Sequence, residues 1–173
     1  MRPITGAEFE SLFQLATRAW HLELRDTYRV VEEDEPFAKW LQGIPDDYAW
    51  REGWLSFVHG VADNGTQIQR LRIVTEPLSD YMRWALEMDP ANITAGEEIR
   101  YLPRQAATGT SLPAEDCWLF DDDKLLLSLF QPDGRGAGYA DANDPELLAT
   151  YRAVRDQLWP QATPYAQYRL ASR

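Results

Sequence analysis

The stretch from Gln67 to Met88, QIQRLRIVTEPLSDYMRWALEM, constrains the fold most, because it changes from strand-like to helix-like within a few residues. Its first half is rich in the aliphatic residues that favour a buried strand: Leu71, Ile73 and Val74. Pro77 suits a first helical turn, and beyond it apolar side chains recur at helical spacing: Leu78, Tyr81, Met82, Ala85 and Met88. In an open α/β sheet, ligands bind in the crevice at the carboxyl ends of such strands. We therefore expect any chemistry to centre on Glu76.

The rest of the chain fits a single α/β domain over residues 1–173, with a mixed sheet of about five strands flanked by helices. An α+β arrangement is the alternative. No run of eighteen apolar residues is present, so we expect no membrane span, and the first residues do not predict a secretory leader. A single cysteine, Cys117, permits no intrachain disulfide and favours a reducing cytoplasm.

The charge of the chain argues against direct nucleic-acid binding. Its formal net charge is −11, and only two lysines are present, Lys39 and Lys124. Phosphate contacts need clustered basic residues, which this composition does not supply. Arginine provides most of the positive charge, so a local arginine pocket for an anion remains compatible with the sequence.

The patterns before Gln67 predict three helices and a strand. A capping box at Thr5 and Glu8 begins a helix over residues 6–20, and alternation over residues 21–29 indicates a strand. The acidic run at residues 32–35 suits the start of a helix that ends near Gly43. Residues 46–62 predict a helix, with a hairpin at Asn64-Gly65 as the alternative.

Beyond the central stretch, Asp89-Pro90 predicts a helix end and residues 92–96 a turn. Strands are expected at residues 98–102, 118–120 and 125–130. Residues 104–113 and 132–139 indicate loops, and a last helix should start at Asn143 or Asp144 and run to Pro160.

The candidate ligand site contains charged residues around the end of the central strand. We expect a pocket lined by Arg72, Glu76, Asp80, Tyr81, Arg100 and Arg104. The simpler interpretation is structural, because arginines such as Arg70 and Arg72 on a buried strand require acidic partners. We expect no metal and no cofactor, since neither the Asp121–Asp123 triplet nor the two histidines form a convincing ligand set.

Residues 70–104, RLRIVTEPLSDYMRWALEMDPANITAGEEIRYLPR, resemble an uncharacterised actinobacterial family with a domain of unknown function. The resemblance extends to Leu22–Tyr28 and to Cys117–Asp121, so it covers most of the chain. Genes of that family commonly lie beside helix-turn-helix regulators and small acidic partners. The resemblance therefore implies association with a transcription-regulatory system, and the acidic charge suits a protein partner of a basic DNA-binding protein.

A second resemblance is to one half of a phospholipase D-like fold. The segment Asp116–Asp123, DCWLFDDD, lies where that superfamily carries a His-x-Lys-x4-Asp motif. Asp116 and Trp118 stand at the His and Lys positions, and only Asp123 matches. Without the His nucleophile, the chemistry of that superfamily is expected to be absent.

The sequence thus favours a non-catalytic cytoplasmic binding or regulatory module that acts with a DNA-binding partner. One alternative is a small-molecule enzyme of specialised metabolism, with Glu76 and Tyr81 as its acid–base pair and an anion pocket lined by Arg72, Arg100 and Arg104. Another is a sensor of an anionic metabolite. A raised carboxylate pKa in a deep pocket would favour the enzyme, and an exposed apolar patch near Trp40, Trp50 or Trp84 would favour the protein partner. The sequence identifies neither the ligand nor the oligomeric state.

Overall fold

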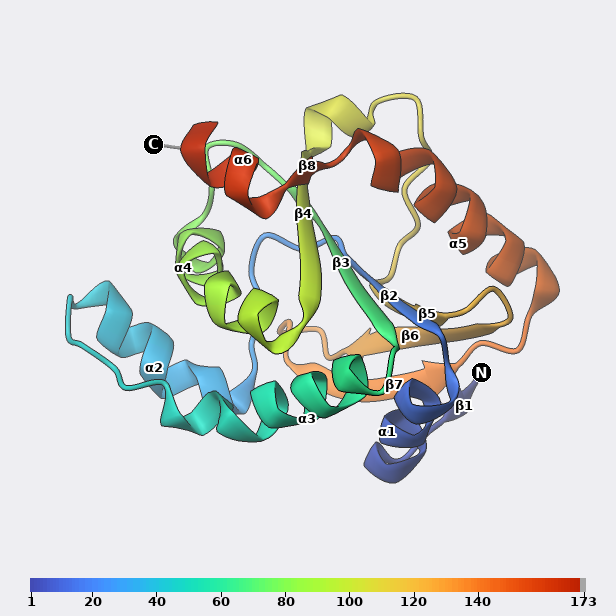
Figure 1. The fold of residues 1–173 in the computed structure, drawn as a ribbon. Helices are drawn as coiled ribbons and strands as arrows, with labels where there is room; N and C mark the ends of the chain where they lie inside the picture. The colour runs from blue at the N-terminus through green and yellow to red at the C-terminus, as the bar shows by residue number, and fades with distance from the viewer. Residues whose placement is uncertain (172–173) are drawn as a thin grey trace.

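The structure, a computed structural model, describes residues 1–171. They form one mixed sheet of eight strands in the order β1-β7-β6-β5-β2-β3-β4-β8, with helices on both faces (Figure 1). Three neighbouring strands are parallel: β2 (Arg18–Glu23), β3 (Gln67–Val74) and β4 (Glu97–Pro103). The others join antiparallel: β1 (Arg2–Pro3), β5 (Cys117–Phe120), β6 (Lys124–Phe130), β7 (Gly136–Asp141) and β8 (Thr163–Pro164).

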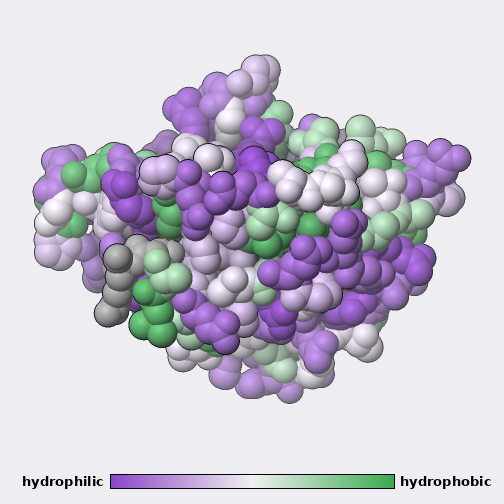
Figure 2. Space-filling model, turned by 90° about the horizontal axis from the view of Figure 1, so that it is seen from above, coloured by the Kyte–Doolittle hydropathy of each residue, from purple (hydrophilic) through white to green (hydrophobic). Residues whose placement is uncertain are grey.

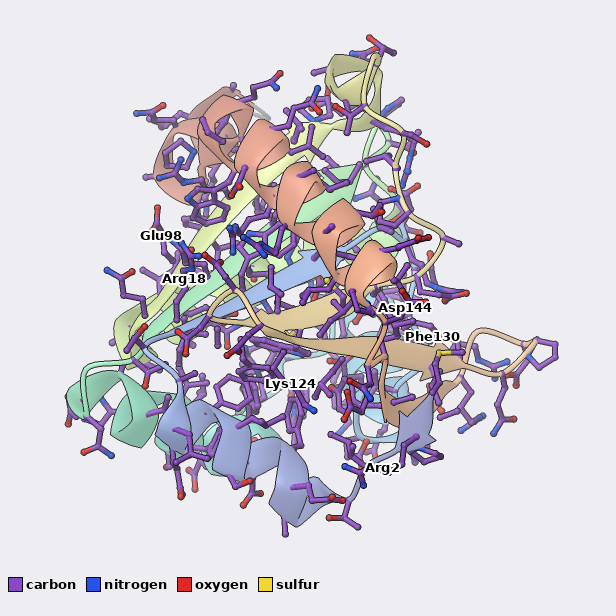
Figure 3. The ribbon with its side chains drawn as sticks, turned by 90° about the vertical axis from the view of Figure 1, so that its right-hand side faces the viewer. Arg2, Arg18, Glu98, Lys124, Phe130 and Asp144 are labelled. Carbon is purple, nitrogen blue, oxygen red and sulfur yellow. The ribbon has the colours of Figure 1, made fainter. Side chains whose placement is uncertain are left out.

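Helices cover the two faces of the sheet unequally. One face, called here the pocket face, carries α1 (Gly6–Leu15), α2 (Val31–Leu41), α3 (Glu52–Asp63) and α4 (Asp80–Ala95). The opposite face carries α5 (Pro145–Leu158), which follows its N-cap residue Asp144 and crosses the strands diagonally (Figure 3). A short helix, α6 (Tyr165–Ala171), packs beside β4, where Tyr168 stacks on Tyr101 at 4.5 Å between ring centroids. Single turns of 3-10 helix lie at Ala49–Arg51, Arg104–Ala107 and Trp159–Gln161.

Local sequence signals explain where the helices begin. Thr5 and Glu8 form the expected capping box of α1. The side chain of Ser79 accepts a hydrogen bond from the Met82 amide at the start of α4, and Asp144 caps α5 in the same way. Each cap satisfies backbone N–H groups that have no partner within the helix.

Alternate residues of the strands build two different faces. The α5 face is a continuous apolar core, in which Trp20, Leu22, Leu71, Ile73 and Leu119 are fully buried. The pocket face contains two separate apolar clusters instead. One surrounds Phe13 beneath α1 and α3, and the other surrounds Trp84 beneath α4. The same face carries three buried charged residues of the central strands: Glu23, Arg70 and Arg72.

The five expected strands are present, but the expectation of about five strands is wrong, because the sheet has eight. β1 and β8 are two residues long, too short to show alternation. β7 lies where the sequence indicated a loop over residues 132–139. It begins with Gly136, Ala137 and Gly138, a composition that weakens any strand pattern.

Two helix boundaries also differ from expectation. α1 ends at Leu15, and Trp20 belongs to β2 rather than to the helix, so the predicted strand over residues 21–29 begins and ends too late.

α4 continues through Pro90 to Ala95, so residues 92–95 of the predicted turn are helical. The helix ends at Gly96, whose φ of +115° and close approach to the Ala62 side chain both require glycine. Helix was the correct choice over a hairpin for α3.

The face of the molecule seen from above is mainly hydrophilic (Figure 2). Seen from above, hydrophobic residues lie in small separate patches (Figure 2). In the described part of the chain, no helix is both long and apolar enough to cross a membrane.

Candidate ligand pocket

A pocket of about 480 Å³ lies between the pocket face of the sheet and helices α2, α3 and α4. Strands β2, β3, β5, β6 and β7 supply its sheet side, and Phe130, the last residue of β6 (Figure 3), lines it. The lining residues used below are His21, Glu23, Tyr28, Glu33, Trp50, Arg51, Trp54, Arg70, Arg72, Tyr81, Asp89, Asp116, Trp118, Phe130, Gly136 and Tyr139. A pocket of this size suits a small organic molecule.

Parallel pairing of β2 and β3 places charged side chains side by side. His21 is opposite Arg70 and Glu23 is opposite Arg72 in the register of the two strands. Residues two apart on a strand share a face, so all four side chains belong to the pocket face. The charged floor of the pocket therefore follows directly from the alternating sequences of two buried strands.

Arg70 is 9% exposed and binds two carboxylates. Its Nε donates to Glu97 Oε1 at 2.7 Å, and its Nη1 donates to Glu23 Oε1 at 2.5 Å. The side chain of Glu97 is 0% exposed, so this ion pair is shielded from water and salt.

Arg72 continues the network from Glu23 to α4. It donates to Glu23 Oε2 and, at 3.0 Å, to Asp89 Oδ1. The second oxygen of Asp89 accepts a hydrogen bond from the Tyr101 hydroxyl at 2.5 Å. Asp89 is fully buried, and the network fixes α4 to the sheet through charged hydrogen bonds.

Asp116, just before β5, forms a second polar cluster at the edge of this floor. Its Oδ2 accepts from the Tyr28 hydroxyl at 2.6 Å and its Oδ1 accepts from the Leu24 amide at 2.9 Å. Burial raises the pKa of Asp116 to about 6, with a further increase from the charge of Glu23. The two hydrogen bonds oppose this shift without cancelling it.

Glu33 in the first turn of α2 forms a similar pair with Tyr81 in the first turn of α4. The Tyr81 hydroxyl donates to Glu33 Oε2 at 2.6 Å. Burial raises the pKa of Glu33. The Tyr28 and Tyr81 ring centroids are 5.7 Å apart, so the two carboxylate–tyrosine pairs adjoin each other.

His21 is a neutral part of the pocket wall. Its ring stacks on Trp118 with 4.1 Å between centroids and 11° between planes. Burial, followed by the charges of Arg70 and Arg72, lowers the pKa of His21 well below its usual value. The imidazole therefore remains uncharged at neutral pH, and Trp118, which also packs against Phe13, lines the pocket beside it.

Arg51 is a third buried arginine, and it has no carboxylate within ion-pair distance among the described residues. It donates to the Met88 carbonyl at 3.1 Å and to Asn92 Oδ1 at 2.7 Å. These bonds hold the guanidinium against α4.

Two of the six residues predicted for a ligand site lie in this pocket: Arg72 and Tyr81. Glu76 lies in a second hollow, with Arg83 and Tyr168, and accepts a hydrogen bond from the Tyr168 hydroxyl at 2.7 Å. The proposed acid–base pair of Glu76 and Tyr81 is therefore not assembled. Asp80 is exposed and forms an ion pair with Arg83 on the surface of α4.

The other two predicted residues point away from the pocket. Arg100 lies on the α5 face, where it binds Glu98 at 2.6 Å and stacks over the Trp159 ring at 4.3 Å from its centroid. Arg104 donates to the carbonyl oxygens of Leu24 and Ile73. Neither contacts Arg72, so the predicted arginine cluster does not form around one ligand.

Sequence reasoning did not select the residues that complete the pocket, chiefly Tyr28, Glu33 and Asp116. Glu33 was visible only as part of an acidic run that fitted a helix start, and that interpretation is also correct. Asp116 and Trp118 were noticed at the positions of a missing catalytic motif, and both line the pocket. The position of Glu23 opposite Arg72 could not be predicted without knowing that β2 pairs with β3.

Within residues 1–171, no group of three His, Cys, Asp or Glu side chains is arranged to hold a metal ion. The carboxylates of the pocket are engaged by arginine and tyrosine side chains instead.

Comparison with known proteins gives one informative result. A family model described as a domain of unknown function, DUF6879, matches residues 7–170, which is nearly the whole chain. A search of curated proteins found no match.

Proposed function

Because the chain belongs to the DUF6879 family, whose description assigns no activity, we propose its function from the pocket: it is a binding module for a small organic molecule. The observation that carries the proposal is a 480 Å³ pocket with polar groups on its sheet side and aromatic residues around them. Pockets of this kind are the usual sites of ligand binding in proteins.

The buried charges support the same proposal. Burying ions is expensive, and replacing such networks by apolar residues is often neutral or stabilising. The α5 face demonstrates that these strands can form an apolar core. Charges retained on the pocket face therefore favour a role in recognition.

Blocking the pocket tests the proposal. Gly136 lines the pocket, and a Cβ built there meets no atom within 4 Å, so Gly136→Trp can place an indole in the cavity. Gly60→Trp is the matched control, because Gly60 lies on α3 outside the pocket lining and also has open space.

The measurement is native mass spectrometry of protein purified from its own host. Wild type and Gly60→Trp should retain a small molecule, and Gly136→Trp should lose it. Retention of the same molecule by Gly136→Trp, or no retained molecule in any of the three proteins, would contradict the proposal.

A second candidate function, an acid–base enzyme in the same pocket, has one observation in its favour. The pKa of Asp116 is raised to about 6, which suits proton transfer near neutral pH. Asp116, rather than Glu76, would then be the proton-transferring group. Incubation of a host metabolite extract with wild type and Asp116→Asn tests this function: turnover by wild type alone supports it, and an unchanged extract rejects it.

We propose further that the module acts in the cytoplasm with a helix-turn-helix DNA-binding partner. The resemblance to an actinobacterial family encoded beside such regulators supports this role, as does the net charge of −11. Trp84 is buried and cannot form the apolar patch expected there, but Val31, Leu41 and Ile44 in and after α2 are exposed. The same mass spectra test the partner, because a retained basic regulator supports it and an unaccompanied chain contradicts it.

A relationship to one half of the phospholipase D-like fold is also a proposal. It is supported by the order of strands and helices and by the location of Asp116 at the position of the missing His. If it holds, the catalytic position of that superfamily has become part of a binding pocket. Replacement of Asp116 by His should then create no phosphodiesterase activity, since the Lys position is Trp118.

A further inference from the structure

The charge balance of the pocket indicates which ligands it would accept. Arg70 and Arg72 together contact three carboxylates, those of Glu23, Glu97 and Asp89. These two guanidinium groups are therefore already neutralised. An incoming anion would have to displace buried ion pairs, and breaking such a pair is costly.

Two further carboxylates of the lining have no arginine partner. Among residues 1–171, neither Asp116 nor Glu33 forms an ion pair, and each is held by a tyrosine hydroxyl. The rings of Tyr28 and Tyr81, whose hydroxyl groups hold these two carboxylates, are 5.7 Å apart, so the two tyrosine–carboxylate pairs are neighbours in the pocket lining. The charge of Arg25 acts on Asp116 and that of Arg72 acts on Glu33, but neither arginine is in ion-pair contact with these carboxylates.

Arg51 does not reverse this balance. Its guanidinium already donates to Met88 and Asn92 on α4, and it is the one lining arginine without a carboxylate among the described residues. Its single positive charge is outnumbered by the carboxylates of Asp116 and Glu33. The network of Arg70 and Arg72 adds three carboxylates and two guanidinium groups, so the formal charge around the pocket is negative.

Aromatic rings surround the same space. Trp54, Trp118, Phe130 and Tyr139 all line the pocket. Arg25 lies over the Phe130 ring at 4.0 Å from its centroid, so this wall already accepts a cation on one ring. Aromatic walls next to a carboxylate form the usual environment for an organic ammonium group.

We propose that the pocket binds an organic amine, with its ammonium group at the carboxylates of Asp116 and Glu33 and its apolar body against Trp118. This inference rests on the proposed function, that the pocket takes a small molecule, and adds the chemical class of that molecule. It replaces the anion expected from the sequence by a cation.

Three indole probes of matched shape test the charge preference: tryptamine is a cation, tryptophol is neutral and indole-3-propionate is an anion. Isothermal titration of the purified full chain measures the affinity for each. A charged hydrogen bond contributes about 1.5–3 kcal/mol, so tryptamine should bind roughly tenfold to a hundredfold more tightly than tryptophol. Indole-3-propionate should bind most weakly.

Asp116→Asn should lower the affinity for tryptamine toward that for tryptophol, with Glu33 still present, and leave the tryptophol affinity unchanged. Glu76→Gln, in the second hollow, is the control and should change neither affinity. A circular dichroism spectrum identical to wild type shows that each variant is folded, and Glu33→Gln provides a second test if Asp116→Asn is not folded.

The amine proposal would be overturned by equal affinities for the three probes, by tighter binding of indole-3-propionate than of tryptamine, or by no binding of any probe. The retention experiment with Gly136→Trp remains an independent test of whether the pocket takes any ligand. A failure of the charge preference can therefore be distinguished from a failure of the proposed function.

Discussion

The two faces of the sheet are made by alternate residues of the same strands, yet they differ in chemistry. On β3, Leu71 and Ile73 enter a continuous apolar core beneath α5, whereas Arg70 and Arg72 enter a hollow, charged region beneath α4. The apolar face is stabilised by close packing of its side chains. The pocket face also needs every buried charge to find a partner. This difference assigns stability mainly to the α5 face and recognition mainly to the pocket face.

The largest expected effect is on the charged network. Arg72→Met leaves Glu23 and the fully buried Asp89 without this cationic partner, and such a loss destabilises a protein by about 3–5 kcal/mol. Urea unfolding measures the change. Arg100→Met is the control, because its partner Glu98 is half exposed, and it should cost less than about 1 kcal/mol. Similar losses for both variants would remove the distinction between the two faces.

The apolar face should respond to a cavity. Leu71 is 0% exposed, and Leu71→Ala should destabilise the protein by about 2–5 kcal/mol. The pocket lies on the other side of the strand, so native mass spectrometry should find the ligand still retained. Loss of the ligand from a folded Leu71→Ala variant would mean that the two faces are not functionally separate.

The pH dependence of stability should identify Asp116. Its pKa is 3.8 as an ordinary side chain and about 6 in the folded protein, so the folded state favours the protonated form. This contribution to stability is complete below pH 3.8 and is lost as the pH rises through 6. Asp116→Asn should therefore be more stable than wild type by about 3 kcal/mol at pH 8.

Unfolding of wild type and Asp116→Asn at several pH values measures this difference, which should shrink as the pH falls and vanish in acid. Asp80→Asn, on the exposed surface of α4, is the control. A difference that grows toward low pH would have the wrong sign and would contradict the burial of an ionisable Asp116.

The smallest effect is expected at the second hollow. Glu76→Gln preserves an oxygen that can accept the hydrogen bond from Tyr168, so stability should change by less than about 0.5 kcal/mol. Ligand retention should also be unchanged. Loss of the retained molecule in this variant would return the functional site to the position expected from the sequence.

Sequence patterns predicted the elements that depend on local signals. The capping residues Thr5 and Asp144 began helices where expected, and the central strand was identified from Leu71 and its neighbours. β7 was not predicted because its sequence shows no clear alternation of apolar and polar residues. It forms a strand through its pairing with β6. Short-range patterns carry no information about such pairing.

The candidate site was only partly predictable for the same reason. Arg72 and Tyr81 were selected because they follow one another closely along the central stretch. Asp116 and Tyr28 are 88 residues apart, and they meet only because β5 pairs with β2. Arg100 was misplaced because the sequence alone did not show that it faces α5.

A crystal structure of the protein as isolated from its host tests the central claim most directly. The account predicts continuous electron density in the pocket for an organic molecule, with a nitrogen atom at hydrogen-bond distance from Asp116 or Glu33 and an apolar part against Trp118. A pocket filled only by ordered water, or one closed by α2 against the sheet, would contradict it.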